Sequence, residues 1–409
     1  MVSLYRGTFS IVDLRAFAHN LRVMANRVHP ETKLLVTVKA NAYGHGVAPI
    51  LEVLAESNVA AVGVASLEEA LQVRQCGYAK PVLVLGSVGA QELPIAARHQ
   101  IHVTYTDAWG DIDALPVMGS EPLHVHTALD TGMNRLGFKS IEHARVVLNQ
   151  ILNRSDMTWS GVSTHLACSD GPSDQHAAEQ IRRFADMISQ LRALGYDVPT
   201  VHASNSGGVL RNGQWHFDMV RIGIAAYGYS PDESVLPMPE LRPVMHMYSS
   251  ITRIADVLPG ETIGYGATFT ATQPMRVATV AAGYADGYPR VLSNSGKVLV
   301  HGQIVPVVGR ICMDQLMIDV SNVSTVRVGD FVTLFGRAAP AAWTPEKWHR
   351  KPPEDRREWL EKSFESDSHG EQNVLSLSDV ASLAMTIPYE MVCQINSRVP
   401  KLYVNEPNS

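Results

Sequence analysis

The sequence carries little charge of either sign. Its 34 Lys and Arg and 40 Asp and Glu residues make up 18% of 409 residues and give a net charge of −6. Soluble domains typically have about 25% charged residues, but the hydrophobic fraction of 45% is ordinary and argues against wholesale disorder. The slight acidic excess argues against dedicated nucleic-acid binding, because phosphate contacts need a basic surface.

Long hydrophobic runs and clustered cysteines are also missing. No stretch of 18 or more apolar residues is present, and the first ten residues show no basic segment followed by an apolar one, so neither a membrane span nor a secretory signal is expected. The cysteines form no CxxC pair, which makes a zinc site or a disulfide framework unexpected; they are Cys76, Cys168, Cys312 and Cys393. We therefore expect a cytoplasmic protein with reduced thiols.

Eight short apolar runs recur in the first 230 residues, and helical patterns separate most of them. The runs are 34–39, 60–65, 81–86, 101–105, 123–129, 160–166, 200–204 and 220–226. Strands that alternate with helices predict parallel pairing, and eight such units fit a (β/α)8 TIM barrel better than an open sheet. From about residue 247 short strands and turns replace the helical patterns. The predicted fold is an N-terminal (β/α)8 barrel, 11–235, and a C-terminal mainly β domain, 236–409, with residues 1–10 associated.

The charge that is present is unevenly distributed. Residues 341–373 hold 8 acidic and 6 basic side chains and three of the six tryptophans. A Pro-Pro pair followed by mixed charges predicts a helix over about 353–364. We interpret the segment at about 338–373 as a charged insertion, a peripheral element of the β domain whose tryptophans pack on that domain.

Polar residues stand where the barrel strands are predicted to end, which is where barrels of this type carry their chemistry. Lys39 ends the first strand, the sixth ends near His165, and the eighth carries Arg221. A Ser/Gly-rich loop begins at Ser204, and such loops bind phosphate in many barrels. Burial lowers the pKa of a lysine and suits it to Schiff-base chemistry. The residues alone leave open an ordinary surface lysine, a pyridoxal phosphate (PLP) enzyme and a sugar-phosphate aldolase.

A set of motifs then resembles one family over nearly the whole chain. VKANAYGHG resembles the PLP-lysine signature of alanine racemases, and the similarity continues through DTGMNRLGF (130–138), STHLACSD (163–170), HASNSGG (202–208), FDMVRIGIAAYG (217–228), IGYGATF (263–269), AAGYADGYPR (281–290), GRICMDQLMIDV (309–320) and TIPYEMVCQINSRVPKLY (386–403). Together these motifs are highly specific, although each alone would be weak.

The resemblance implies a PLP-dependent enzyme of fold type III that interconverts L- and D-alanine and supplies D-alanine for peptidoglycan. It implies two-base proton abstraction on an external aldimine. Lys39 would hold PLP and serve the D face. Tyr265 would serve the L face from the other subunit of a homodimer that shares its active sites. Membrane and nucleic-acid partners are not expected.

The resemblance also assigns the cofactor contacts. Arg221 would face the pyridine nitrogen, with His165 beside it. The phosphate would be held by Tyr43, Ser204, the backbone of Gly223 and Ile224, and Tyr389. Because arginine cannot take up the proton that an aspartate would hold there, the pyridine is expected to stay mostly unprotonated, which favours rapid reprotonation over transamination.

Substrate contacts come from three further segments. Arg135 would neighbour the substrate carboxylate, to which a guanidinium is geometrically suited. Met313 would offer its backbone N–H, with Asp314 fixing the loop, and Tyr284 would narrow the access route. Many family members have a carbamylated lysine two residues before the Asp-Thr-Gly-Met motif. Ala128 stands there in this chain, so a bound anion or another side chain must orient the arginine.

Three alternatives and one structural possibility stay open. The alternatives are a racemase with serine or broader specificity, a basic amino-acid decarboxylase, and a PLP carrier without turnover. His124 and His126 lie on one face of a strand near Asp130, where they could be metal ligands. We expect ordinary polar side chains there and no metal.

Overall fold

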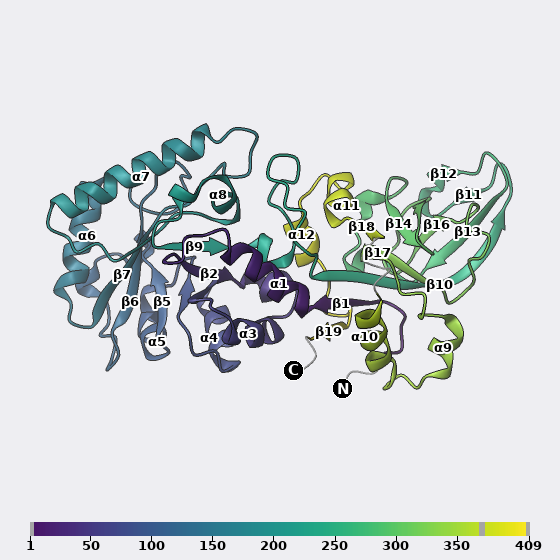
Figure 1. Cartoon of the computed structure of the whole chain (residues 1–409), viewed down its shortest axis with the longest axis horizontal. Coiled ribbons are helices and arrows are strands. Elements are labelled where there is room, and N and C mark those ends of the chain that lie inside the picture. The colour runs from purple at the N-terminus through teal and green to yellow at the C-terminus, as the bar shows by residue number, and fades with distance from the viewer. Residues whose placement is uncertain (1–3, 368–372, 406–409) are drawn as a thin grey trace. The chain divides into compact units, whose positions relative to one another are not determined.

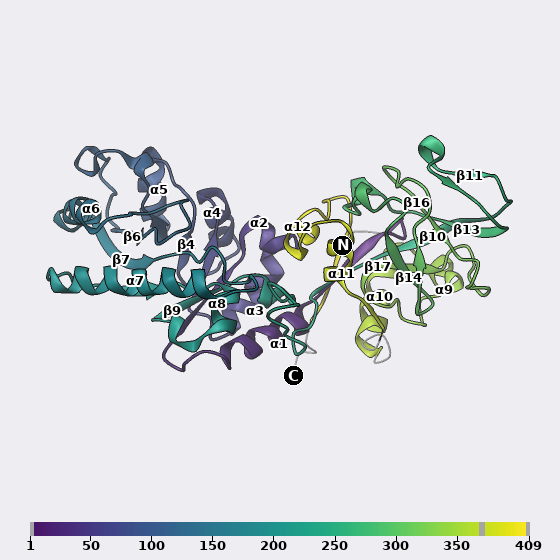
Figure 2. The same ribbon diagram turned by 90° about the horizontal axis from the view of Figure 1, so that it is seen from above.

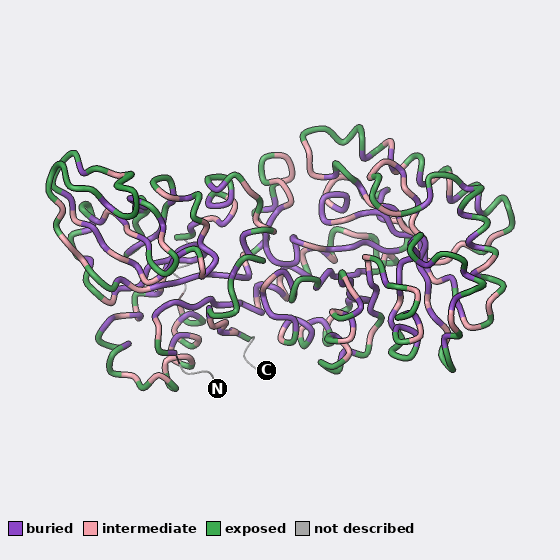
Figure 3. The backbone as a smooth tube through the Cα atoms, turned by 180° about the vertical axis from the view of Figure 1, so that it is seen from behind, coloured by how far each residue is buried: buried purple, intermediate pink, exposed green. Residues whose placement is uncertain are grey.

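A computed structural model describes residues 4–367 and 373–405 of the chain. The chain forms two compact units, one from Phe17–Arg242 and the other from Met1–Ala16 together with Pro243–Ser409. In each unit the buried segments run through the interior and the exposed ones lie on peripheral loops and helices (Figure 3). Within the described ranges, no helix combines the length and apolar character needed to cross a membrane.

The unit Phe17–Arg242 is built around a closed barrel of eight parallel strands. They are β2 (Lys33–Thr37), β3 (Ala61–Val64), β4 (Val82–Val84), β5 (Ile101–Thr104), β6 (Leu123–Ala128), β7 (Met157–Ser163), β8 (Thr200–His202) and β9 (Met219–Ile222). The barrel closes where β9 pairs with β2, with Leu34 opposite Val220. The predicted (β/α)8 barrel is confirmed.

Helices cover the outside of this barrel, as Figures 1 and 2 show. They are α3 (Val47–Glu56), α4 (Leu67–Gln75), α5 (Leu93–Arg98), α6 (Ile141–Asn153), α7 (Gln175–Ala193) and α8 (Ser206–Arg211), while α1 (Leu14–Ala25) and the short turn α2 (Lys39–Tyr43) flank β2 in sequence. The long helix α7 buries Phe184, Ile188 and Leu191. Their spacing of four and three residues places them on one face of the helix, which explains why it packs against the strands.

The second unit is mainly β, as predicted. One sheet contains β1 (Phe9–Asp13), β10 (Met245–Val257), β13 (Met275–Val280), β14 (Lys297–Val300), β15 (Gln303–Pro306), β16 (Leu316–Asp319), β17 (Phe331–Arg337), β18 (Val374–Leu375) and β19 (Lys401–Val404). A separate hairpin joins β11 (Thr262–Ile263) to β12 (Phe269–Thr270). The long strand β10 organises the sheet, because it pairs with β1, β13 and β17.

Among the described residues, four α-helices follow the long strands of the second unit, and two of them lie in the charged segment. They are α9 (Pro345–Arg350), α10 (Arg356–Ser366), α11 (Leu377–Leu383) and α12 (Pro388–Cys393). The helix predicted over about 353–364 is thus present as α10, shifted by a few residues. Part of the segment, 368–372, lies outside the described residues.

The charged segment contributes to the hydrophobic core of the second unit. Trp343 and Trp348 are buried in one cluster with Phe9, Tyr248 and Phe331. The Trp343 ring centroid lies 5.6 Å from that of Phe9 and 4.9 Å from that of Tyr248, with steeply inclined rings. The expectation that the tryptophans pack on their own domain is confirmed. Most other residues of the segment are exposed or half-buried, and α10 adds Leu360 and Phe364 to the cluster.

Replacing Trp343 with alanine is expected to lower the free energy of unfolding by about 3–5 kcal/mol, because it empties a closely packed aromatic site. Chemical denaturation of the holoprotein measures this loss. Tyr5→Ala is the matched control, since Tyr5 is 80% exposed and exposed substitutions usually change stability by about 0.5 kcal/mol or less. An equal, small effect of both substitutions would show that the segment does not belong to the core.

Candidate active site

Lys39 opens a strained turn at the mouth of the barrel. The four residues after it have φ angles of 52°, 54°, 55° and 51°, a left-handed run that costs L-amino acids about 1–2 kcal/mol each. Two side chains hold the turn: Glu69 Oε1 accepts from the N–H of Ala40 at 2.7 Å, and Asn41 Oδ1 accepts from that of Val47 at 2.8 Å. Backbone strain of this kind concentrates at functional sites.

The Lys39 side chain is exposed in this chain, which corrects the expectation of a desolvated lysine. The strand β2 ends at Thr37, so Lys39 stands beyond the strand, where the left-handed turn begins. The turn holds its backbone firmly and leaves the amine accessible. Accessibility suits a lysine that must reach a bound molecule.

Arg221 is buried inside the barrel, and both terminal nitrogens of its guanidinium donate hydrogen bonds. Nη1 donates to His202 Nδ1 at 2.8 Å, and Nη2 donates to the carbonyl oxygens of Thr164 and Ala203, both at 2.8 Å. Burial lowers the pKa of Arg221 to about 10, with a smaller contribution from Arg135. Arg221 therefore remains a cation at neutral pH, and its rotamer is fixed by contacts at the ends of two barrel strands, β7 and β8.

His165 takes its tautomer from Arg221. Arg221 Nη2 lies 3.2 Å from His165 Nδ1, and because a guanidinium has no acceptor, Nδ1 must accept and the hydrogen must sit on Nε2. Burial, and to a smaller extent the charges of Arg221, Arg135 and Lys39, lower the pKa of His165 to about 3. His165 is consequently a neutral imidazole whose Nε2–H can donate to another group.

Gly223, Ser206 and Tyr43 form a small polar cradle beside Arg221. The N–H of Gly223 donates to Ser206 Oγ at 2.9 Å. A Cβ built on Gly223 would lie 3.0 Å from Tyr43 Oη and 3.8 Å from Ser206 Oγ. Glycine thus leaves space beside two hydroxyl groups, an arrangement that fits an anionic phosphate approached by hydroxyl donors. Ile224 follows directly and begins a 3₁₀ turn, Ile224–Tyr227.

Ser204, which was predicted to hold the phosphate, does not take part in this cradle. Its hydroxyl donates to the carbonyl oxygen of Trp215 at 2.8 Å, so its only hydrogen is already used within the barrel. Ser206, two residues later at the start of α8, lies beside Gly223 instead. The sequence offered both serines in one Ser/Gly-rich loop, and only the three-dimensional course of that loop separates them.

Arg135 stands on a loop that folds back on the end of β6. Asp130 Oδ1 accepts from the N–H of Gly132 at 3.1 Å and of Asn134 at 2.9 Å, and the N–H of Phe138 donates to the carbonyl oxygen of Ala128 at 2.9 Å. Arg135 itself is exposed, and within the described residues no hydrogen bond or ion pair orients its guanidinium. That finding agrees with the alanine at position 128, which cannot supply a carbamylated lysine.

The second unit gathers the other predicted residues on neighbouring loops. Tyr265 is 70% exposed, Met313 52% and Tyr284 40%. The loops of Tyr284 and Met313 are joined directly, because the N–H of Tyr284 donates to the carbonyl oxygen of Cys312 at 3.1 Å. The Tyr265 loop packs on the same segment, since a Cβ on Gly264 would lie 3.1 Å from the backbone nitrogen of Arg310.

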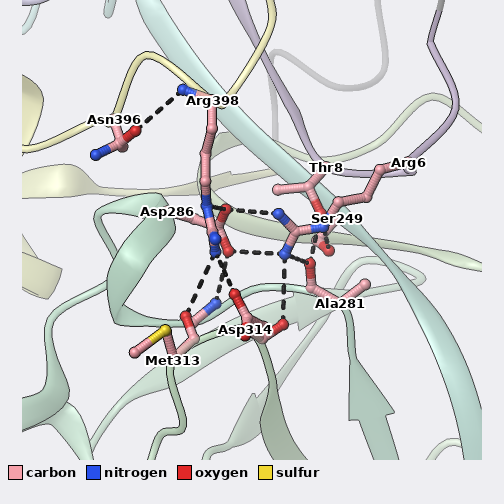
Figure 4. Close-up of polar contacts among 10 residues, drawn as sticks. Arg6, Thr8, Ser249, Ala281, Asp286, Met313, Asp314, Asn396 and Arg398 are labelled. Carbon is pink, nitrogen blue, oxygen red and sulfur yellow. Dashed lines mark hydrogen bonds and ion pairs between the residues drawn. The ribbon is translucent and has the colours of Figure 1, made fainter.

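A buried carboxylate, Asp286, clamps these loops together (Figure 4). Its oxygens accept from Arg6 Nη1 and Nη2 at 2.7 and 2.8 Å and from Arg398 Nε at 2.8 Å. Arg398 Nη2 also pairs with Asp314 Oδ1 at 2.8 Å, and Asp286 Oδ2 accepts from the N–H of Gly283 at 2.9 Å. Asp314 is thus tied to the same cluster, and Asp286, although it lies in the motif AAGYADGYPR, was not singled out by any pattern in the sequence.

Removing the Asp286 charge is expected to weaken folding in a pH-dependent way. Burial acts to raise the pKa of this carboxyl, but Arg6 and Arg398 hold it below its ordinary value. The charged Asp286 therefore stabilises the fold above the pKa that the carboxyl has in the unfolded chain, about 3.9. This stabilisation is lost as the pH falls through the lower pKa of the folded protein. Asp286→Asn should cost about 2 kcal/mol at neutral pH, since both arginines remain partly hydrated.

Denaturation of this variant and the wild type at neutral and acidic pH measures the effect. The difference in unfolding free energy should shrink as the pH falls. Asp256→Asn is the control, because Asp256 lies exposed on the same unit and should show no comparable difference. A deficit that stays constant down to strongly acidic pH would contradict the assignment of the Asp286 charge.

Tyr389, His124 and His126 lie outside the Gly223 cradle and the joined loops described above. Tyr389 lies in α12 and is half-buried in the second unit. His124 Nδ1 pairs with Ser160 Oγ at 2.8 Å, whereas His126 bonds other imidazoles. Among the described residues, no group of three or more His, Cys, Asp or Glu side chains is arranged to hold a metal ion.

Known proteins match the chain along nearly its whole length. Residues 12–231 match the family described as alanine racemase, N-terminal domain, and residues 244–354 match alanine racemase, C-terminal domain. Alanine racemase 2 of Caldanaerobacter subterraneus subsp. tengcongensis is 34% identical over 98% of this chain and 95% of that protein. Alanine racemase 1 of Oceanobacillus iheyensis is 35% identical over 98% of this chain and 100% of that protein.

Solved structures agree with these matches. A crystal structure of alanine racemase from Bacillus anthracis with bound L-Ala-P superimposes with a TM-score of 0.85 at 30% identity, covering 100% of this chain and 97% of that one. The alanine racemase from E. faecalis gives a TM-score of 0.84 at 30% identity, covering 98% and 100% of the two chains. By family models, sequence and fold alike, the chain belongs to the alanine racemase family.

Proposed function

We propose that this protein is a PLP-dependent alanine racemase that acts with two bases, Lys39 and Tyr265. The observation that carries the proposal is the buried cation Arg221, held between two neutral imidazole acceptors, His202 and His165, beside the Gly223 cradle. Family membership indicates the class of reaction, and the barrel contains polar residues suited to bind the cofactor of that reaction.

The barrel residues fit the cofactor group by group. Tyr43 and Ser206 offer hydroxyls and Gly223 offers an open backbone for the phosphate, and Ser206 replaces Ser204 in this role. Lys39 offers an accessible amine for covalent attachment. When bound, PLP supplies an electron sink that acidifies the Cα–H of an amino acid joined to it.

Arg221 governs the electronics of the site. A guanidinium with a pKa of about 10 cannot accept a proton at neutral pH, so Arg221 offers no base that would keep a proton on a facing ring nitrogen. It thereby limits how long negative charge persists on the substrate Cα and favours rapid return of a proton. Its rigid anchoring by Thr164 and Ala203 keeps this arrangement in place.

Inversion at Cα without a large movement of one base calls for a proton donor-acceptor on each face of the substrate. Lys39 Nζ would exchange the proton on the D face and Tyr265 Oη on the L face. A phenol ordinarily has a pKa of about 10, so it is rarely ionised at neutral pH and needs a partner that stabilises its anion. The Nε2–H of His165, whose position is fixed by Arg221, is suited to donate to that oxygen.

A second subunit completes the proposal. Tyr265, Met313 and Tyr284 are all substantially exposed on one set of joined loops, which is what a surface that serves a neighbouring active site requires. Met313 would offer its N–H to the substrate carboxylate opposite Arg135. We propose a homodimer in which each active site combines one barrel with the partner's β unit, and we propose that its D-alanine serves peptidoglycan synthesis.

Product analysis of the purified holoprotein tests this function. With L-alanine, chiral chromatography should show D-alanine until the enantiomers are equal, with L-serine turned over far more slowly. Borohydride reduction should fix the cofactor to the peptide containing Lys39, and expression should rescue a bacterium that requires D-alanine. Release of CO2 would indicate a decarboxylase, preferential turnover of serine would indicate the broader racemase, and bound PLP without any turnover would indicate a carrier.

A further inference from the structure

A chain of hydrogen-bonded imidazoles extends from Arg221 across the barrel. His202 Nδ1 faces Arg221 Nη1 at 2.8 Å, and His202 Nε2 lies 3.1 Å from His126 Nδ1. His126 Nε2 then lies 3.1 Å from His102 Nδ1. Four strands, β5, β6, β8 and β9, contribute one member each. The proposed function uses only the Arg221 end of this chain.

Arg221 dictates the direction of every hydrogen bond in the chain. A guanidinium only donates, so His202 Nδ1 must accept and its hydrogen must sit on Nε2. His126 Nδ1 then accepts from His202, which places the hydrogen of His126 on Nε2. His126 in turn donates to His102 Nδ1. A neutral chain therefore has one tautomer per ring, and each tautomer is set by its neighbour.

The barrel is built to allow this chain. His126 belongs to β6 and His202 to β8, with β7 between them. Gly161 on β7 stands opposite His126 after a shift in the β6–β7 register. A Cβ on Gly161 would lie only 2.1 Å from His126 Nδ1. The missing side chain is what lets the His126 ring pass over β7 and reach His202.

Burial keeps the chain neutral. Together with the smaller effect of neighbouring histidines, it lowers the pKa of His126 to about 3 and that of His102 to about 4. The pKa of His202 is also well below its ordinary value, through burial and the charge of Arg221. At physiological pH no ring carries the second proton that would turn an acceptor into a donor.

We propose that His126 and His102 are positioning residues for Arg221: they fix the tautomer of His202, which keeps His202 as the acceptor that aims the guanidinium. Without His126, His202 can carry its hydrogen on Nδ1, and two donors then face each other across 2.8 Å. Arg221 then loses the hydrogen bond to His202, and the orientation of its guanidinium is no longer fixed. The consequence for turnover rests on the proposed function, whereas the tautomer order does not.

Nitrogen-15 NMR of the histidine side chains in the cofactor-free full chain tests the order directly. His202, His126 and His102 should each show a pyridine-like Nδ1 and a pyrrole-like Nε2. His126→Phe should leave His202 with mixed tautomers, and His126→Asn, which retains an acceptor near the Nδ1 position, should restore the wild-type pattern. A wild-type His202 with its hydrogen on Nδ1, or an unchanged His202 in His126→Phe, would overturn the proposal.

Kinetics of the reconstituted variants test the consequence. His126→Phe should lower kcat by about 3- to 30-fold with KM for alanine within about twofold, and His126→Asn should recover most of the loss. Gly161→Ala removes no titratable group but displaces the His126 ring, so it should resemble His126→Phe. His124→Phe is the control: it keeps the stacking on His102, whose ring lies 4.4 Å away, and lies outside the chain.

Each failure has a distinct meaning. A wild-type protein without racemase activity would refute the proposed function and leave the NMR test of the chain intact. An active wild type whose His126→Phe and Gly161→Ala variants keep full kcat and the His202 tautomer would refute the chain alone. If His126→Phe does not fold, His102→Phe carries the test, and it should release the tautomer of His126.

Discussion

Lys39→Ala is expected to abolish racemisation, with kcat lower by about 10⁴-fold or more in both directions. The substitution removes both the covalent attachment of the cofactor and one of the two bases, and a positioned base alone accounts for about 10²–10⁴. The exposed amine can be deleted without opening a core cavity, so the fold and its unfolding free energy should change little. Chiral analysis of alanine and the cofactor absorbance measure the two losses.

Lys33→Ala is the control for this substitution. Lys33 begins the same strand, β2, and is also exposed, but it lies at the opposite end of the strand, where barrels carry stability rather than chemistry. It should retain full activity. A Lys39→Ala protein that racemises alanine at the wild-type rate and retains the cofactor absorbance would remove the basis of the assignment.

Tyr265→Phe is expected to lower kcat/KM by about 10²–10⁴-fold, and by the same factor in both directions. L- and D-alanine have equal free energy, so no variant can favour one direction in kcat/KM. The asymmetry appears instead in exchange with solvent. In deuterated water the variant should still exchange the Cα hydrogen of D-alanine through Lys39, while exchange into L-alanine is lost.

Tyr5→Phe serves as the control, because this tyrosine is also highly exposed on the second unit and no motif involves it. Loss of activity on Tyr265→Phe without any change in fold is expected, since the ring is 70% exposed and only its hydroxyl is removed. Equal solvent exchange into both enantiomers by the Tyr265→Phe protein would contradict its place on one face.

The barrel and its strand ends could be predicted because parallel strands have a strong local signal. Each strand is a short β-branched run between helical patterns, so the sequence placed Arg221 in the last strand and Lys39 within two residues of the end of the first, β2. Contacts between side chains of different strands could not be predicted from the sequence. The hydrogen bond between His126 and His202 crosses β7 and depends on the missing side chain of Gly161. No local sequence pattern predicts this contact.

Other differences arose where tertiary contacts override local preference. The left-handed run after Lys39 contains no glycine until Gly44, and Asn41 and Glu69 stabilise it. Ser204 and Ser206 are equivalent in composition, and only Trp215 decides which hydroxyl is used internally. In the 341–373 segment the charged residues and the tryptophans gave opposite signals, and only the structure shows which aromatic rings Trp343 and Trp348 contact.

The central claim, exchange of the substrate proton between two bases, is tested most directly by the first turnovers of L-alanine in deuterated water. Two bases on opposite faces predict that D-alanine carries deuterium at Cα from the earliest measurable product, while the remaining L-alanine is still protiated. Mass spectrometry after chiral separation gives both numbers. Early D-alanine that retains the original hydrogen would mean that a single base carries the proton from face to face, and it would contradict the account.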